Sequence, residues 1–474
     1  MSSVHEEFLQ RIEFSNEEIK SIMPYWEHTC RLLGLNDKDV RIAIDEWIGK
    51  YWDMSLKGVR QCIGAYVREL IELVRMKEYQ QNGAKILYCN MPTHPACLLS
   101  NKIAGGDRLH IAHPDWLVTS VMSAFFNKPV TSEVEDSFAM NPSCRHCAMN
   151  QFRIMAQKKQ IITNPDAYWN WGLCCNEGPK TEEMIRCLGN DDWHYVLTTL
   201  PHDVMNGAVE ADDERRVEYL ARQLQEAQKK ISKYTEIDVS ETEVIEAEKQ
   251  YFRYLQKVDD LTDIVSFSDP QPIGGNDLTL FSAPTALAFD TGFHYLEEAL
   301  DTLIEEARER VQKKEGPLPA GSPRLACHFV PYCVPWIAEE FKDAGINLSI
   351  NTFFATAKDQ MKYNDEKDIY KKIARQWFCN PCAVNLGNEA KLVVDRLERY
   401  PVDGVLYGFF SFDRWIGSLQ KMLIKTVEER AGIPHFYLEG DFFDDSSCAF
   451  QDKKARIESI GYHVKIRKLI NAGD

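Results

Sequence analysis

The sequence has too few basic residues for a protein that binds nucleic acid through its overall charge. Its 474 residues include 55 Lys and Arg against 72 Asp and Glu, which gives a net charge of −17. This excess repels phosphate backbones and anionic membrane surfaces, and we find no local basic patch that offsets it. We therefore expect no nucleic acid and no membrane surface as partner, but a protein or a small molecule.

Targeting and membrane-spanning patterns are also missing. The start of the chain shows neither a basic region followed by an apolar core nor a small-residue cleavage site. No window holds about 18 consecutive apolar residues, the length that a transmembrane helix needs. We expect a cytoplasmic protein, and the 44% hydrophobic and 27% charged content is typical of a globular fold with large cores.

Several catalytic motifs are absent as well. The sequence contains no GxxxxGK[ST] phosphate-binding loop and no GxGxxG turn after a strand, so it offers no place for ATP hydrolysis or for a classical dinucleotide site. A GxSxG elbow and an HExxH helix are missing too, which argues against serine hydrolases and zinc proteases. Any nucleotide energy must come from another protein.

What the sequence does contain is an alternation of short apolar runs with segments long enough for helices. Residues 1–80 have the pattern of a helical segment, with Asn16 as a helix cap. We expect strands at 84–89, 168–175, 193–200, 324–331, 347–354, 404–412 and 435–443. The alternation predicts an α/β fold with two doubly wound (Rossmann or flavodoxin-like) parallel-sheet domains, at residues 81–205 and 266–474. The highly charged residues 206–265 carry an apolar seam, which predicts a long helical connection between the domains.

Fourteen cysteines are many for a protein of a reducing compartment, where structural disulfides are not expected. We interpret those that stand singly in apolar surroundings as small buried hydrophobes, namely Cys30, Cys62, Cys97 and Cys187. Three groups stand out by their spacing: Cys144 with Cys147, the adjacent Cys174 and Cys175, and Cys379 with Cys382. Such groups hold zinc, hold an iron–sulfur cluster or form a redox dithiol, and the spacing alone leaves these alternatives open.

The position of some of these cysteines is informative, because ligands of doubly wound sheets bind beyond the carboxyl ends of the strands. Cys174, Cys175 and Cys333 fall at or just past the ends of expected strands. Ligands scattered over separate strand ends suit a cluster that is held between two domains.

Histidine and tryptophan residues supply further candidates. His94 and His146 are possible ligands or proton carriers, although a lone histidine is more often a hydrogen-bonded structural residue. Trp169, Trp171 and Trp415 lie beside expected strand ends, where they either line a pocket for an apolar acyl group or belong to the core.

Taken together, these features resemble one known family. The sequence is similar to the cluster-bearing subunits of the 2-hydroxyacyl-CoA dehydratases and of ATP-dependent benzoyl-CoA reductase. The resemblance covers residues 84–460 and is most specific near the end, where DGV, a strand-end turn and then IP…EGD follow one another. The segments that carry it are GLCCNEGPKTEEM (172–184), PLPAGSPRLACHFVPYCVPW (317–336), WFCNPCAVN (377–385), PVDGVLYGFFSFDRWIGSLQKM (401–422) and AGIPHFYLEGDFFDD (431–445).

The resemblance implies an oxygen-sensitive hetero-oligomer in which paralogous subunits each hold a 4Fe-4S cluster through three cysteines. A separate ATP-hydrolysing iron–sulfur activator supplies one low-potential electron. That electron reduces a CoA thioester to a ketyl radical, which leads either to loss of the 2-hydroxyl group or to reduction of an aromatic ring. The acyl group and the choice between these two outcomes stay open.

Carried onto this sequence, the resemblance implies particular site residues. The first two cluster ligands fall on Cys147 and Cys175, with Cys144 and Cys174 as alternates. The third belongs at the turn after DGV, where this sequence has Phe412. We take Cys382 in its place, with Cys379 and Cys333 as alternates, because CNPC resembles a Cys-x-x-Cys of the reductase-type subunits.

The substrate-binding candidates are His94, Trp415 and Glu439, the last from the EGD ending, and no catalytic residue is assigned. Phe412 also keeps a second hypothesis open. Under it, the chain is a paralogous subunit that retains the fold but has lost its cluster, and that serves as a scaffold or an electron-docking surface.

Overall fold

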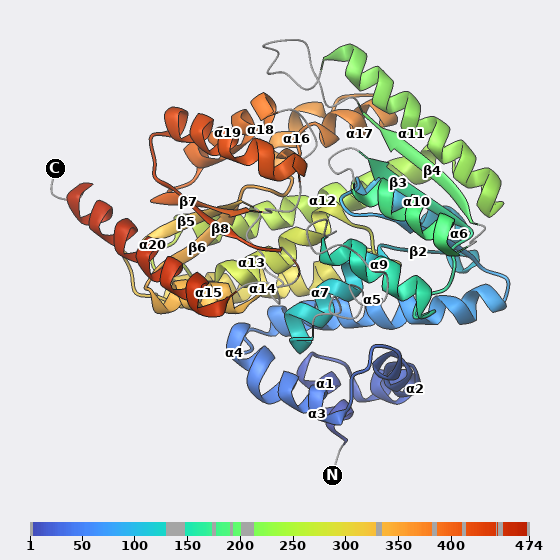
Figure 1. The fold of residues 1–474 in the computed structure, drawn as a ribbon, viewed down its shortest axis with the longest axis horizontal. Coiled ribbons are helices and arrows are strands. Elements are labelled where there is room, and N and C mark those ends of the chain that lie inside the picture. The colour runs from blue at the N-terminus through green and yellow to red at the C-terminus, as the bar shows by residue number, and fades with distance from the viewer. Residues whose placement is uncertain are drawn as a thin grey trace.

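The computed structural model describes residues 3–128, 147–172, 177–189, 193–200, 213–328, 334–381, 386–409, 414–441, 443 and 449–471. The described strands form two four-stranded parallel sheets of the same internal order, β2-β1-β3-β4 and β6-β5-β7-β8 (Figure 1). In both sheets the strand order reverses beside the first strand, as in doubly wound folds. The predicted α/β class with two parallel-sheet domains is confirmed. We call the first sheet with its helices domain I and the second domain II.

The N-terminal region is helical, as predicted. It contains α1 (Val4–Arg11), α2 (Asn16–Leu32), α3 (Asp37–Ile42), a π-helical stretch (Ala43–Ile48), α4 (Gly49–Tyr51) and the long α5 (Lys57–Gln81). The expected cap at Asn16 is wrong by one residue. Ser15 accepts a hydrogen bond from the main-chain N–H of Glu18, whose carboxylate accepts one from the Ser15 N–H in return. This capping box satisfies both donors at once, which Asn16 in the first turn does not.

Domain I is built on β1 (Lys85–Cys89), β2 (Leu109–Ala112), β3 (Ala167–Gly172) and β4 (His194–Thr199). Its described helices are α6 (Pro95–Gly105), α7 (Pro114–Phe126), α9 (Ala148–Lys158) and α10 (Glu177–Gly189), with a 3₁₀ turn at Gly106–Arg108. Strand β2 was not among the expected strands. Its four residues are too few to show a period in the sequence, and they form a strand because they pair with β1.

The two long helices of the predicted connection are α11 (Glu214–Thr235) and α12 (Glu241–Phe267). Ser240 and Glu243 form the capping box that begins α12. Helix α12 packs against α6 of domain I and against β6 and α17 of domain II, so it runs between the two sheets (Figure 1). After it come α13 (Gly275–Ser282), a 3₁₀ turn (Ala283–Ala286) and α14 (His294–Lys313), which packs along α5.

Domain II is built on β5 (Arg324–His328), β6 (Asn347–Asn351), β7 (Gly404–Phe409) and β8 (His435–Glu439). Its described helices are α15 (Trp336–Asp343), α16 (Ala357–Gln360), α17 (Ile369–Trp377), α18 (Leu386–Arg399), α19 (Arg414–Ala431) and α20 (Phe450–Asn471), with a 3₁₀ turn at Met361–Tyr363. Gly345 and Gly432 follow α15 and α19 with φ of +70° and +68°, a backbone conformation that glycine adopts readily.

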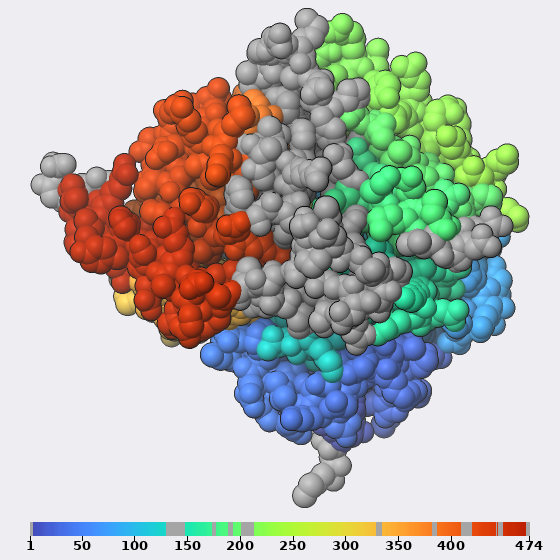
Figure 2. Space-filling model, in the orientation of Figure 1, coloured from blue at the N-terminus to red at the C-terminus, as the bar shows by residue number. Residues whose placement is uncertain are grey.

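Buried apolar residues show how the layers are assembled. One large core joins the N-terminal helices, domain I, the connecting helices and the α16–α17 part of domain II. Domain II has a core on each face of its sheet, one under α15 and α20 and the other under α18 and α19. In Figure 2, domain II (orange to red) and domain I (green) form two lobes above the N-terminal helices (blue).

Candidate functional site

Cys147, the first predicted cluster ligand, stands at the start of α9. It is the N-cap residue of this helix and is partly exposed, but its side chain does not cap the helix. Its main-chain N–H donates to Oε2 of Glu177 at 3.0 Å, and the same oxygen accepts from Nδ2 of Asn150 at 3.2 Å. Glu177 is the first residue of α10 and follows Cys175 by two residues. The backbone at Cys147 is therefore bonded to the helix that follows the second cysteine group.

A buried ion pair adds a second connection between α9 and α10. Nε of Arg153 lies 3.1 Å from Oε1 of Glu182, and both side chains are 1% exposed. Because two sets of contacts join the helices, Cys147 is held at a defined position beside the carboxyl end of β3.

Domain II reaches the same place through the EGD segment. β8 ends at Glu439, and Asp441 two residues later accepts a hydrogen bond from the main-chain N–H of Ala148 at 2.9 Å. Asp441 is 7% exposed, and its other oxygen accepts from the N–H of Phe443 at 2.8 Å. The start of α9 is thus a point of direct contact between the two domains, at the sheet edge where doubly wound folds bind ligands.

Asn90 organises the point where the strand order of domain I reverses. It follows β1, and its side chain donates to the carbonyl of Trp171 at 3.3 Å and accepts from the N–H of Trp171 at 2.6 Å. Gly178 at the start of α10 lies so close that an added Cβ would be 3.3 Å from Asn90 Nδ2. Sequence reasoning missed Asn90, although an amide directly after a strand was the available signal.

His94 is deeply buried at the start of α6. It is 2% exposed, and its Nε2 lies 3.0 Å from Oε1 of Gln376 on α17. Its ring makes an edge contact with Tyr251 on α12, and among the described residues Nδ1 has no hydrogen-bond partner. Burial lowers the pKa of His94 to about 3, so the imidazole is neutral at neutral pH.

Gln376, the partner of His94, belongs to a buried network of hydrogen bonds between the domains. Nε2 of Gln376 donates to Oε1 of Glu248 at 2.7 Å, and the other oxygen of Glu248 lies 2.9 Å from Nζ of Lys372. This network joins α6, α12 and α17, and therefore links both domains and the helical connection between them. A role for His94 in binding the substrate stays a prediction.

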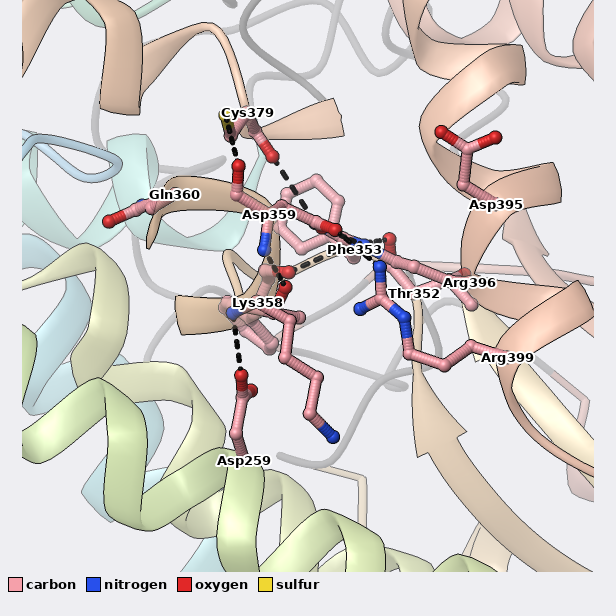
Figure 3. Close-up of polar contacts among 12 residues, drawn as sticks. Asp259, Thr352, Phe353, Lys358, Asp359, Gln360, Cys379, Asp395, Arg396 and Arg399 are labelled. Carbon is pink, nitrogen blue, oxygen red and sulfur yellow. Dashed lines mark hydrogen bonds and ion pairs between the residues drawn. The ribbon is translucent and has the colours of Figure 1, made fainter. Parts of the chain in front are cut away.

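Cys379 lies in a different polar cluster, in the loop after α17 (Figure 3). Its thiol is 3% exposed in this buried setting and donates to the carbonyl oxygens of Asp359 at 3.2 Å and Arg375 at 3.6 Å. Arg396 Nη2 donates to the Cys379 carbonyl at 3.2 Å. The structure thus engages this thiol in hydrogen bonds to the backbone, and a ligand role for it stays a prediction.

Two of the three tryptophans near strand ends, Trp169 and Trp171, belong to the core, which was one of the two alternatives for them. Trp169 is 1% and Trp171 0% exposed, and Trp171 makes an edge contact with Trp377 at 4.9 Å between ring centroids. Glu439 is exposed at the end of β8. The side chain of Trp415 lies outside the described residues.

The remaining ligand candidates lie outside the described residues, namely Cys144, His146, Cys174, Cys175, Cys333 and Cys382, and so does Phe412. Within the part of the chain that the structure describes, no three His, Cys, Asp or Glu side chains are grouped so as to hold a metal ion. Cys147 alone of the described cysteines combines partial exposure with a place at the interdomain edge. It fits as one cluster donor.

Cys187, expected to be buried, is exposed on α10, so that interpretation is wrong. An apolar neighbourhood in sequence does not show which side of a helix faces the core.

The fold and this edge define a two-domain α/β protein whose domains meet beyond the carboxyl ends of their strands. A family model described as 2-hydroxyglutaryl-CoA dehydratase, D-component, matches residues 173–461, which is more than half of the chain. The chain belongs to this family, and the resemblance seen in the sequence is confirmed. It is accordingly a subunit of a 2-hydroxyacyl-CoA dehydratase-type enzyme, from a family that works with a partner subunit and an activator and is associated with iron–sulfur clusters. No curated protein matches the sequence.

Among the helices that the structure describes, none combines the length and the apolar character needed to cross a bilayer.

Proposed function

We propose that this chain is a subunit of an oxygen-sensitive enzyme that holds a 4Fe-4S cluster through Cys147, Cys175 and Cys382 and acts on a CoA thioester. The observation that carries the proposal is the hydrogen bond from the Cys147 N–H to Glu177, at 3.0 Å. Since Glu177 lies two residues from Cys175, this bond joins the backbone segments of two proposed ligands at the ligand-binding edge of the sheet. A bound cluster supplies low-potential one-electron chemistry and an open iron position that acts as a Lewis acid.

Where α6, α12 and α17 meet, the chain's own residues exclude water and offer polar contacts. His94, Gln376 and Glu248 are nearly inaccessible to solvent where α6, α12 and α17 meet. With its low pKa, His94 is a weak base and stays neutral, and Nε2 carries the ring proton because it faces Oε1 of Gln376. We therefore assign Nδ1 the role of accepting a hydrogen bond from a hydroxyl or amide N–H group of the substrate, not of removing a proton. Trp415 and Glu439 remain the further candidates for binding the substrate.

The proposed partners follow from the family and from what the sequence lacks. A paralogous subunit completes the enzyme, and an ATP-hydrolysing iron–sulfur activator delivers the electron, since the chain has no phosphate-binding loop of its own. The reaction is then dehydration of a 2-hydroxyacyl-CoA or a benzoyl-CoA reductase-like ring reduction through a ketyl radical.

The test compares two cysteine variants purified without oxygen. Cys147→Ala should lose most of the bound iron and the absorbance near 400 nm, because a ligand is removed. Cys187→Ala is the matched control, since Cys187 is an exposed cysteine on α10 and should leave iron unchanged. Equal iron in both variants and in the unchanged protein would contradict the ligand assignment. Adding a 2-hydroxyacyl-CoA to the reduced protein should alter its electron paramagnetic resonance spectrum, whereas free CoA should not.

A second candidate function rests on Phe412, which stands where the family has its third cysteine. Phenylalanine cannot bind iron, and the chain would then be a cluster-less scaffold or electron-docking subunit. That protein would be colourless when purified alone and would contain no iron. Its Cys147→Ala variant would match the unchanged chain in iron content and in absorbance near 400 nm.

A further inference from the structure

We propose that Asp441 is a positioning residue: from domain II, its carboxylate holds the start of α9 and thereby sets the place of Cys147 at the edge between the domains. The part of this inference that concerns a cluster rests on the proposed function above. The part that concerns α9 rests on the geometry alone.

A hydrogen bond joins Asp441 to the first residue of α9. The first N–H groups of a helix have no partner within the helix, and Ala148 is the first residue of α9. Oδ2 of Asp441 accepts from the Ala148 N–H at 2.9 Å, while Oδ1 accepts from the N–H of Phe443 at 2.8 Å. Both oxygens are used, one by the loop of domain II and one by the helix of domain I. The carboxylate is therefore fixed to its own loop and can hold the helix in a defined position.

A second carboxylate, that of Glu177, binds the same end of the helix. Glu177 accepts from the N–H of Cys147 at 3.0 Å, so the two successive N–H groups on either side of the Cys147 Cα are bonded to two different carboxylates. Glu177 belongs to domain I and Asp441 to domain II. The positive end of the helix dipole favours both charges. The backbone of Cys147 is consequently held from both domains. This sets the direction of its Cα–Cβ bond, and so the side on which the thiol lies.

Two measurable effects follow. Removal of the Asp441 carboxylate frees the Ala148 N–H, so the start of α9 should exchange its amide hydrogens faster. Replacement of Asp441 by asparagine keeps the shape and an acceptor oxygen but removes a negative charge beside the proposed ligand. Since nearby charge and hydrogen bonds set the reduction potential of a cluster, this variant should keep its iron and shift its midpoint potential to a more positive value.

The experiment uses the full chain with its co-purifying partner, and compares Asp441→Ala, Asp441→Asn and the control Asp166→Ala. Asp166 also accepts a main-chain hydrogen bond, from Ile86 at 2.9 Å, but within domain I. Hydrogen exchange by mass spectrometry should show the peptide that contains Ala148 exchanging about tenfold faster in Asp441→Ala, the effect of losing a hydrogen bond to a charged group. The control should not change exchange at that peptide.

A redox titration followed by electron paramagnetic resonance provides the second readout. A positive shift in Asp441→Asn with unchanged iron content supports the positioning role, because a merely structural effect would lower iron without moving the potential. Unchanged exchange in Asp441→Ala would overturn the inference. If the unchanged protein binds no iron, the proposed function fails, and the exchange experiment still decides whether Asp441 holds α9. If the unchanged protein binds iron and neither variant alters the exchange or the potential, the proposed function stands and this inference fails.

Discussion

Arg153 and Glu182 form an ion pair with an Nε–Oε1 distance of 3.1 Å and with both side chains 1% exposed. The pair joins α9, which begins at Cys147, to α10, which begins two residues after Cys175. The guanidinium also lies over the ring of Tyr168 at 5.1 Å and over that of Trp193 at 5.5 Å. The charge of Arg153 is thus compensated by its ion pair with Glu182, by the nearby carboxyl group of Asp115 and by aromatic faces.

The first prediction concerns the stability that depends on this pair. Glu182→Ala removes the ion-pair partner of the buried Arg153 and should lower the free energy of unfolding by about 3–5 kcal/mol, the cost of breaking a buried ion pair by removing one partner. Denaturant-induced unfolding followed by circular dichroism measures it. Glu183→Ala is the control, since Glu183 pairs with Lys180 on the surface and both side chains are 61% exposed. The control should change the free energy by no more than about 1 kcal/mol. Equal effects of the two substitutions would contradict the account of the buried pair.

The second prediction concerns pH. In the folded chain the pKa of His94 is about 3, whereas an unperturbed histidine titrates near 6.5. Between these values the unfolded chain binds a proton that the folded chain does not, so stability should fall as the pH decreases from about 6.5 toward 3. His94→Asn removes this dependence.

The measurement is the difference in free energy of unfolding between the unchanged chain and His94→Asn over the pH range in which both fold. That difference should change by at most about 1.4 kcal/mol per pH unit below pH 6.5, in the direction that favours the variant at low pH. His463→Asn, at an exposed position on α20, controls for the loss of one histidine. A difference that does not vary with pH would show that His94 is not held in its neutral form.

The third prediction concerns the cluster that engages Cys379 (Figure 3). Arg396 pairs with Asp359 at 2.9 Å and donates to the carbonyls of Thr352 at 2.6 Å and Phe354 at 2.7 Å, as well as to that of Cys379. A lysine keeps the charge but lacks the planar set of donors, so Arg396→Lys should leave several buried carbonyls without partners. We expect a loss of about 3 kcal/mol of stability, because each unsatisfied buried group costs about 1–3 kcal/mol.

Arg399→Lys is the matched control for this substitution. Arg399 also pairs with Asp359, at 2.8 Å, but its side chain is 28% exposed and so remains in contact with water. Its replacement should cost about 1 kcal/mol or less. Thermal unfolding of the two variants side by side distinguishes them, and an equal decrease in melting temperature would argue against the role given to Arg396.

The sequence predicted the layout of the fold because short apolar runs alternate clearly with segments long enough for helices. Each expected strand corresponds to one in the structure. β2 was missed because its four residues carry no period of their own and depend on pairing with β1. The cap at Ser15 was missed because Asn16 is an equally good capping residue by type, and only the return contact from Glu18 decides between them.

The sequence singled out cysteines as candidate ligands, which stay predictions, but it did not indicate the contacts around Cys147. Cys147 stood out through its spacing from Cys144, since two thiols three residues apart are a chemical signal in sequence. Nothing in the sequence joins Ala148 to Asp441, which are 293 residues apart, because that contact depends on how the two domains pack. His94 was a candidate as an isolated histidine, but its neutral state arises from burial against Tyr251 and Gln376, which a local pattern does not encode.

The most direct test of the central claim is the iron and acid-labile sulfide content of the chain purified without oxygen, together with an electron paramagnetic resonance spectrum after reduction by dithionite. The account predicts about four of each per chain and the signal of a reduced 4Fe-4S cluster. Iron and sulfide near zero in this chain, with a brown partner subunit beside it, would contradict the account and identify the chain as the cluster-less member of the complex.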